Sequence, residues 1–500
     1  MELSVALSSL ANLVSSPVLM GLMLLSVPIG TFFGVVPGLG GKLGIVLLIP
    51  FVYGMDQVTG AVFLLGMHAV VHTGGAVPSI LFNVPANGPE AATLLDGYPL
   101  TKMGKAGRAL GASLMSSGVG GIIGAVAMAL MLPLIEPIVL SFSPAEFFLL
   151  ALFGITFIAT LAGEAMVPGI IVGLFGLMVA CIGQDPQTGT ARYAFGQLWL
   201  WDGVDIITAV LGMFAVPEML ELGLSGNPVN TNAGRTRYSY GEVLQGMLDV
   251  FRHWKLTVRT SLIGFVIGMI PGLGGECASW MCYGHAVQSS KHPERFGKGA
   301  IEGVIAPETA NNAKEGGALL PTLFFGVPGS SGMAILLGAF VMLGIKPGPM
   351  MIVNDLPLVW TLVWALVVSN LLCSAMLLVG ARWFGMVSSM PSRLLVPIVF
   401  LLTMVGCFVS KGHWENFTVL LALGGLGYLF KRCGWPRPPF VIGLVLGSIA
   451  EQSLHKAINL WGYSFLTRPL SMVLIGLIIA SVIWHFMRPK AGKPVIAYDA

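Results

Sequence analysis

The sequence has few charged residues for its length, and this scarcity decides the class of protein. Of 500 residues, 10% are Asp, Glu, Lys or Arg and 55% are apolar, and the mean hydropathy is +0.85. Soluble proteins usually carry about 25% charged residues, so this chain cannot cover a water-facing surface. Apolar runs of roughly 20 residues, long enough to cross a hydrocarbon core, recur along the chain. The sequence therefore predicts an all-α polytopic membrane protein with about 10–12 spans.

Several chemical motifs are also missing. The six cysteines form no CxxC pair and do not cluster with histidine, which favours buried thiols over a metal or redox site. GLGGKLG around Lys42 does not complete a nucleotide-binding G-x-x-x-x-G-K-[ST] loop. We therefore expect no metal, no cofactor and no nucleic-acid partner. No Lys or Arg precedes Lys42, so we expect the first span to be an uncleaved anchor.

The chain is rich instead in glycine and proline, and many of these residues lie inside its apolar runs. It has 66 Gly and 31 Pro, and PGLGG occurs twice, at Pro37–Gly41 and Pro271–Gly275. Both residue types interrupt helices, so each PGLGG predicts a helix break inside an apolar run. GGAVPSILFNVPAN (Gly74–Asn87) and GGALLPTLFFGVPGS (Gly316–Ser330) form a second matched pair in the same order. Two ordered matches indicate an internal duplication.

The positions of Lys and Arg orient the two halves. In the first half, loop 51–60 has no Lys or Arg, whereas loop 86–108 has Lys102, Lys105 and Arg108. In the second half the order is reversed, because loop 284–302 has three basic residues and loop 328–350 has one. Basic loops stay in the cytoplasm. The pattern therefore predicts two inverted-topology repeats with broken or re-entrant helices, a frequent plan of secondary transporters.

We divide the chain into three parts on this basis. Residues 1–222 form the first inverted repeat with the spans that follow it. Residues 223–257 form a polar, basic connector that we place in the cytoplasm. Residues 258–500 form the second inverted repeat with its following spans. We expect a moving transport unit, as in an elevator, beside a static scaffold.

These stretches resemble a known family. The motifs that carry the resemblance are PGLGG, AATLLDGYPL, GQDPQTGTARYAFG and the long block FGKGAIEGVIAPETANNAKEGGALLPTLFFGVPGSSG. Together with PPFVIGLVLGSIAEQSL they resemble the large membrane subunit (TctA-type) of the tripartite tricarboxylate transporters over residues 20–475. In HAVVHTGG, Thr73 stands where the family usually has Tyr, and His68 and His72 are further departures.

The resemblance implies a binding-protein-dependent, ion-coupled secondary transporter that takes up a small carboxylate of the di- or tricarboxylate class. The coupling ion would be Na⁺ or H⁺, without ATP hydrolysis. The implied partners are a small membrane subunit of about four helices and an extracytoplasmic substrate-binding protein, in the lipid bilayer of a bacterial inner membrane. A transporter for a non-carboxylate metabolite and a passive channel stay open as alternatives. An intramembrane enzyme is a further alternative, although no nucleophile–base arrangement stands out.

The helix breaks supply the candidate substrate site. Free N–H groups and the positive end of a helix dipole bind anions, and nearby hydroxyl and amide groups would complete such a site. The candidate residues are Gly38, Leu39, Gly40, Gly74, Gly75, Asn83, Asn87, Gly272, Gly274, Asn311, Asn312, Gly329, Ser330 and Ser331. The alternative is that the small residues serve only close helix packing.

Lys42 and Glu276 directly follow the two PGLGG motifs, and an inverted repeat would relate them by a pseudo-twofold axis. Charges at membrane depth usually pair or serve function. One hypothesis is that the two side chains pair, or that Lys42 meets the substrate while Glu276 balances it. The other is that each faces a water-filled vestibule. Glu308 is a third candidate, for the route of the coupling ion.

His68 and His72 are spaced i, i+4 and therefore share one face of a helix. Such a pair can handle protons or substrate, bind a metal, or simply form hydrogen bonds in the interior. Asp96 and Tyr98, in DGYPL, are expected in a loop turn.

Overall fold

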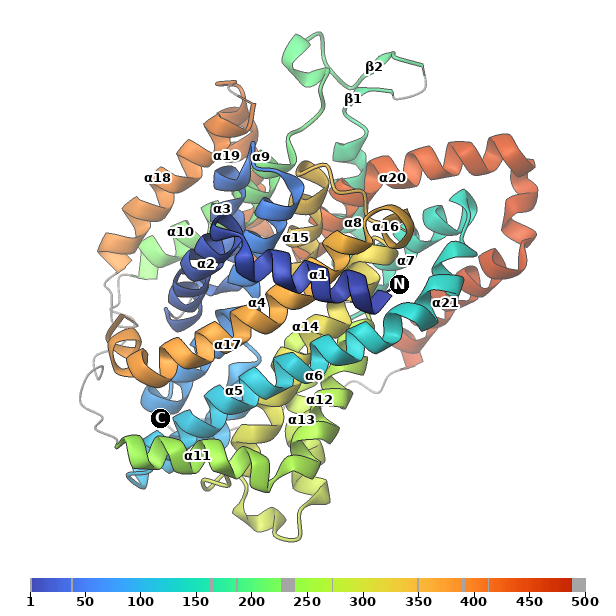
Figure 1. Cartoon of the computed structure of the whole chain (residues 1–500). Coiled ribbons are helices and arrows are strands. Elements are labelled where there is room, and N and C mark those ends of the chain that lie inside the picture. The colour runs from blue at the N-terminus through green and yellow to red at the C-terminus, as the bar shows by residue number, and fades with distance from the viewer. Residues whose placement is uncertain are drawn as a thin grey trace.

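The computed structural model describes residues 2–36, 39–161, 166–185, 188–225, 239–271, 273–348, 350–387, 392–411 and 413–487. Within these ranges the chain is helical apart from one short hairpin of β1 (Gly183–Gln184) and β2 (Ala191–Arg192) (Figure 1). The α-helices are α1 (Glu2–Ser15), α2 (Pro17–Val35), α3 (Gly40–Val52), α4 (Gln57–Phe82), α5 (Glu90–Lys102), α6 (Ala106–Leu140), α7 (Pro144–Leu161), α8 (Met166–Ala180), α9 (Ile206–Val210), α10 (Val216–Ser225), α11 (Tyr240–Arg252), α12 (Trp254–Met269), α13 (Gly274–Ser289), α14 (Glu302–Phe324), α15 (Ser331–Met342), α16 (Met350–Asn354), α17 (Leu356–Val387), α18 (Ser392–Lys411), α19 (Asn416–Arg432), α20 (Pro438–Trp461) and α21 (Pro469–Met487). The shorter elements are the 3₁₀ turns η2 (Leu198–Leu200), η4 (Pro293–Arg295) and η5 (Gly462–Thr467), and the π-helical turn η3 (Leu211–Ala215).

The protein is a multi-pass membrane protein, but few of its helices are full spans. By length and composition, four helices of the described ranges can cross a membrane, and a fifth if the bent pair Ala450–Thr467 and Pro469–Ile483 counts as one. The predicted 10–12 spans are not found at full length. The reason is that breaks divide the apolar runs into shorter helices, as where α2 ends at Val35 and α3 begins at Gly40.

The centre of the molecule is a bundle of tightly packed helices. Helix α2 lies along α4, and α12 lies along α14. Helix α6 packs on α14, and α17 packs on α4. The packing brings backbone against backbone, because a Cβ added at Gly30 or Gly268 would lie within 3.0 Å of the carbonyl oxygen of Met67 or Lys314. Glycine allows this approach because it has no side chain.

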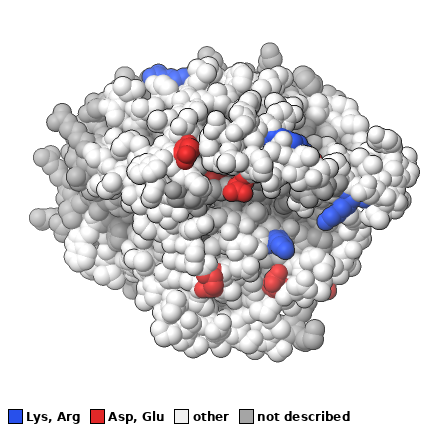
Figure 2. All heavy atoms as spheres, turned by 90° about the horizontal axis from the view of Figure 1, so that it is seen from above, with Lys and Arg blue, Asp and Glu red and all other residues white. Residues whose placement is uncertain are grey.

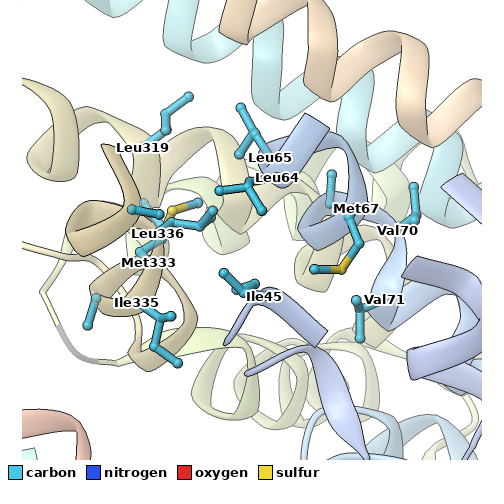
Figure 3. Close-up of a cluster of buried hydrophobic side chains, with 14 of the residues drawn as sticks. Ile45, Leu64, Leu65, Met67, Val70, Val71, Leu319, Met333, Ile335 and Leu336 are labelled. Atoms are coloured by element: carbon cyan, nitrogen blue, oxygen red, sulfur yellow. The ribbon is translucent and has the colours of Figure 1, made fainter. Parts of the chain in front are cut away.

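An apolar cluster fills the space between the broken helices and the long central ones. Figure 3 shows Ile45 of α3, Leu65 of α4, Leu319 of α14 and Leu336 of α15 in one buried apolar cluster. All four are fully buried. This packing fixes the start of α3 and of α15 against the central pair α4 and α14.

Asp96 and Tyr98 lie in α5, so the expectation of a loop turn was wrong. Glu90 in the first turn and Lys102 in the last turn of this helix both favour the helix dipole. The buried carboxylate of Asp96 accepts hydrogen bonds from the N–H groups of Gly299 and Ala300, each at 2.8 Å. Asp96 therefore ties α5 to the segment that precedes α14.

Part of the basic connector is ordered on the bundle. Residues 226–238 lie outside the described ranges, but α11 packs along α6. Arg108 of α6 forms an ion pair with the buried Asp249 of α11, and the N–H of Gly107 donates to Glu242. Figure 1 shows α11 at the end of the molecule opposite the β1–β2 hairpin.

The close packing of the α12 and α14 backbones can be tested by replacing a glycine with alanine, which adds one methyl group. We expect Gly268→Ala to destabilise the protein by about 1–3 kcal/mol, because the added Cβ meets the carbonyl of Lys314. The control is Gly284→Ala, where a Cβ would meet nothing within 4 Å and helix propensity would improve. Thermal melting of the detergent-purified variants measures the difference. Equal melting temperatures for the two would contradict the close packing described above.

Candidate functional site

Four helix breaks meet at one cavity of about 450 Å³. Two of them belong to the first half of the chain, between α2 and α3 and between α4 and α5. The other two belong to the second half, between α12 and α13 and between α14 and α15. Residues 39–43, 86–89, 273–276 and 330–332 line the cavity from these breaks.

The local backbone explains why the breaks form where they do. Gly40 and Gly274, at the first positions of α3 and α13, have φ values of +65° and +64°, a region that L side chains rarely adopt. Asn83 ends α4 in the left-handed region at φ 61°, a conformation that asparagine tolerates. Ser330 caps α15, because its Oγ accepts a hydrogen bond of 3.2 Å from the N–H of Met333.

Charged side chains stand on the cavity wall. Lys42 and Glu276 are both exposed to it, and no ion pair joins them among the described residues. The Glu276 side chain lies against Gly88, where an added Cβ would come within 2.6 Å of the carboxyl carbon. Arg437 donates to the Glu218 carboxylate at 2.9 Å, so its charge is already balanced. The Lys42 ammonium group therefore forms no ion pair among the described residues, although Glu276 on the same wall is near enough to attract it.

A buried cluster adjoins the cavity between α4, α5 and α14. His72 Nδ1 lies 2.9 Å from Glu90 Oε1, and His72 Nε2 lies 3.8 Å from Glu315 Oε1. His68 Nε2 lies 3.5 Å from Glu315 Oε2, and Lys314 forms an ion pair with Glu315. His68, His72 and Lys314 also line the cavity, so the cluster has one side open to it.

The structure places the candidate residues in two groups. Those that line the cavity are Leu39, Gly40, Lys42, Asn87, Gly274, Glu276, Ser330 and Ser331. Those that do not line it are Gly74, Gly75, Asn83, Glu308, Asn311, Asn312 and Gly329. Gly38 and Gly272 lie outside the described residues.

The second group has other contacts. Asn312 Nδ2 donates to Thr73 Oγ1, to Asn370 Oδ1 and to the carbonyl oxygen of Ser117, which joins α14 to α4, α17 and α6. The Glu308 carboxylate accepts from Thr93 at 2.6 Å and from Ser117 at 3.0 Å. These polar groups hold helices together in the interior, because a buried polar atom must find a partner there.

Asn311, in the same group, lies directly behind the cavity wall. It is buried, its Oδ1 has no hydrogen-bond partner, and a Cβ added at Gly275 would lie within 3.0 Å of this oxygen. The side chain is therefore directly behind a residue of the cavity wall. Its oxygen is an acceptor that the fold leaves unused.

Several residues of the site were missed in the sequence. Lys314, Glu218 and Arg437 line the cavity, and Glu90 and Glu315 lie behind it. Lys314 and Glu315 were visible in APETANNAKEGG, but a charged pair there is equally typical of a solvated loop. Arg437 comes from the proline-rich segment before α20, and no repeat or motif indicated that it lies near the breaks.

A family model described as "Tripartite tricarboxylate transporter TctA family" matches residues 20–442. The chain belongs to the TctA family. The match includes the whole cavity lining, from Leu39 to Pro439. This TctA-family chain is therefore a membrane component of a transporter and not an enzyme.

Two curated relatives come from Agrobacterium vitis. An "uncharacterized 52.8 kDa protein in TAR-I ttuC' 3'region" is 30% identical over 479 residues, which cover 94% of each chain. An "uncharacterized protein in TAR-II ttuC' 3'region" is 34% identical over 224 residues, which cover 44% of this TctA-family chain and 92% of that protein. No solved structure matches the chain.

The two groups of candidate residues predict different mutant behaviour. We expect Asn312→Ala to lower the melting temperature, because each buried partner left unsatisfied costs about 1–3 kcal/mol. The control is Asn87→Ala, which should leave stability unchanged because the buried Asn87 Nδ2 has no partner. Thermal melting in detergent compares the two. A wild-type melting curve for Asn312→Ala would show that this side chain does not hold the four helices together.

Proposed function

We propose that the chain is the large membrane subunit of a binding-protein-dependent, ion-coupled secondary transporter that takes up a small di- or tricarboxylate. The observation that carries the proposal is the cavity at which four helix breaks meet beside the unpaired Lys42. Its volume of about 450 Å³ falls in the usual range of about 300–1,000 Å³ for small-molecule sites. The family description names tricarboxylates as the class of solute.

The chemistry of the wall suits an anion that has lost its water. Lys42 supplies a positive charge, and α3, α13 and α15 begin at the cavity with their N-terminal N–H groups. Helix N-termini and cations together stabilise carboxylates. Asn87 Nδ2 adds a buried donor that has no partner in the protein.

We further propose that the two halves are repeats, on the evidence of matched glycine contacts. Gly30 and Gly34 of α2 face the carbonyl groups of Met67 and Val71 of α4. Gly264 and Gly268 lie 234 residues after these glycines, and Ala310 and Lys314 lie 243 residues after Met67 and Val71. Gly264 and Gly268 face the carbonyl groups of Ala310 and Lys314 in the same way. The same offsets relate the contact of Gly74 with Thr31 to that of Gly317 with Phe265. Three contacts reproduced by one pair of offsets support a duplication.

Contacts between loops support the inverted relation. Gln57, after α3, donates to the carbonyl of Gly344, after α15, at 3.1 Å. Asp96 of α5 binds the N–H of Gly299, in the segment after α13. These two contacts therefore join segments that do not correspond in the alignment of the repeats, as two antiparallel halves require.

We propose residues 1–222 and 258–500 as the two repeat-containing parts, with 223–257 as the cytoplasmic connector. Helices α7, α8, α20 and α21 pack on one another and lie on one side of the bundle in Figure 1. They are our candidates for the scaffold, and the broken helices α3, α5, α13 and α15 with α4 and α14 for the moving unit. A bacterial inner membrane is the compartment that this proposal requires.

The proposed partners are a small membrane subunit and an extracytoplasmic binding protein. Phe195 and Leu198 lie in the segment after β2 and are 82% and 75% exposed. We place this segment outside and offer it as a dock for the binding protein. Arg192 is tied to Glu451 and Asp185 and is not free for a partner. Figure 2, seen from above, shows few and scattered charges, so docking there would depend mainly on apolar and polar contacts.

The inverted topology predicts which positions label from which side. In a cysteine-free background, single cysteines at the exposed Gln57 and Lys346 should react with an impermeant reagent added outside intact cells. Those at the exposed Lys105 and Glu294 should react only after the membrane is permeabilised. Labelling of Gln57 and Glu294 from one side would refute the inverted arrangement.

The anion site is tested with the complete three-part transporter in proteoliposomes, supplied in turn with citrate, succinate and malonate. We expect Lys42→Met to fold normally, because Lys42 has no ion-pair partner, and to weaken uptake about 10- to 150-fold, as loss of a charged hydrogen bond of about 1.5–3 kcal/mol would. Lys291→Met, in an exposed loop, is the control. Unchanged uptake by Lys42→Met would exclude Lys42 from the site. Equilibration without accumulation would indicate a passive channel.

A further inference from the structure

We propose that His72, between Glu90 and Glu315 at the edge of the cavity, binds one proton together with the substrate anion, so that uptake is driven by the proton gradient. This inference rests on the proposed function. It names the coupling ion and its binding atom, which the family leaves open.

The contacts of His72 define which nitrogen takes the proton. Nδ1 lies 2.9 Å from Glu90 Oε1. With Glu90 ionised, its carboxylate only accepts hydrogen bonds, so Nδ1 carries the hydrogen when the ring is neutral. Nε2 then holds the lone pair, and it faces Glu315 Oε1 at 3.8 Å. A proton added to Nε2 would give His72 a positive charge that is hydrogen-bonded to Glu90 and within ion-pair distance of Glu315.

Several buried polar atoms around His72 have no hydrogen-bond partner. Glu90 and Glu315 are 0% and 1% exposed, and Oε2 of each is buried without a hydrogen-bond partner. Both ring nitrogens of His68 are also buried and without hydrogen-bond partners, and His68 Nε2 lies 3.5 Å from Glu315 Oε2. Buried carboxylate oxygens without donors are costly. A proton on His72 Nε2 would face Glu315 Oε1 and would lower the cost by reducing the net negative charge of the buried group, although it gives neither Oε2 atom a donor.

The charged residues that face His72 have a net charge of −1, which one added proton would neutralise. They are Glu90 from α5 and Lys314 and Glu315 from α14, and their sum is −1 when both imidazoles are neutral. Helices α2 and α15, which also pack on α4, contain no charged residue. Helices α6 and α17 pack on α4 as well, and their charged residues are Arg108, Glu136 and Arg382. Lys42 and Glu276 stand on the cavity wall with charges of opposite sign, and Glu308 on α14 is bonded to Thr93 and Ser117.

This balance couples the proton to the substrate. A carboxylate that enters beside Lys42 meets a net negative cluster when His72 is neutral and a neutral one when it is protonated. Each ligand therefore strengthens the binding of the other. His68 lies against Gly332, at the start of α15, where an added Cβ would fall within 3.0 Å of its ring. The cluster is thus in contact with the wall that receives the anion.

The step needs no other reactant. A proton from the outer solution binds Nε2 through the cavity, one N–H bond forms, and the same bond breaks when the site opens to the inner solution. A metal ion is a poorer occupant, because the described residues contain no group of three or more His, Cys, Asp or Glu placed to hold one. Sodium could use the Oε2 atoms of Glu90 and Glu315, but it would also meet the imidazole nitrogens beside them and the Lys314 ammonium group, whereas hard cations prefer a shell of oxygen ligands.

The experiment uses the complete transporter in proteoliposomes with radiolabelled citrate, succinate or malonate. We expect accumulation with an inward proton gradient in the absence of Na⁺, and none with a Na⁺ gradient at equal pH. In His72→Gln, gradient-driven accumulation should fall by roughly 5- to 150-fold, which is the typical strength of coupling between two binding sites. The variant should keep exchange of external for internal carboxylate, because exchange requires no net proton transfer.

The controls separate coupling from folding and from the proposed function. His455→Gln, on α20 away from the cavity, should behave as wild type. If His72→Gln does not fold, Glu90→Gln is used, and it should lose gradient drive while keeping exchange. Accumulation driven by Na⁺ alone, or a His72→Gln variant that still responds to the proton gradient, would overturn the inference and leave the carboxylate transporter standing. Failure of every carboxylate under every gradient would overturn both.

Discussion

Backbone that leaves the helix at membrane depth must find polar partners, and much of this structure follows from that requirement. Lipid offers no hydrogen bonds, so irregular backbone survives only where it is buried in protein or lines a wet cavity. Here four breaks are gathered around one cavity. The N–H groups that each break frees are directed at the same space. The breaks that cost the helices their hydrogen bonds therefore also form the polar site.

Close packing of the remaining helices makes this gathering possible. Glycines on α2 and α12 let backbones touch α4 and α14, and these contacts fix where each broken helix restarts. Gly34 lies one residue before the end of α2, and Gly268 one residue before the end of α12. The last close contact therefore comes just before each break. Small displacements of α4 relative to α14 would move both breaks of a half together.

The sequence predicted the membrane class, the helix breaks and the family, because these depend on local composition and on motifs. PGLGG is readable as a break since its residues cannot continue a helix well. It could not predict the number of full spans, because short apolar helices read like spans when they are joined by a few residues. It also misplaced Asp96, since its partners Gly299 and Ala300 lie about two hundred positions away in the chain.

The same limit explains the candidate site. Residues in the breaks were found because the motif itself forms the wall, as with Gly40, Gly274 and Ser330. Asn312 and Glu308 were chosen for their chemistry alone, and in the structure their side chains form hydrogen bonds to other helices. Whether a polar residue faces a cavity or a neighbouring helix depends on its position around the helix axis and on what packs there. In α14, Glu308 and Asn312 share a face at i, i+4 and bond to other helices, while Asn311 and Lys314, at i, i+3, share the face toward α13 and the cavity. One rotation of about 100° per residue thus separates the residues that bond to other helices from those that lie at or behind the cavity wall.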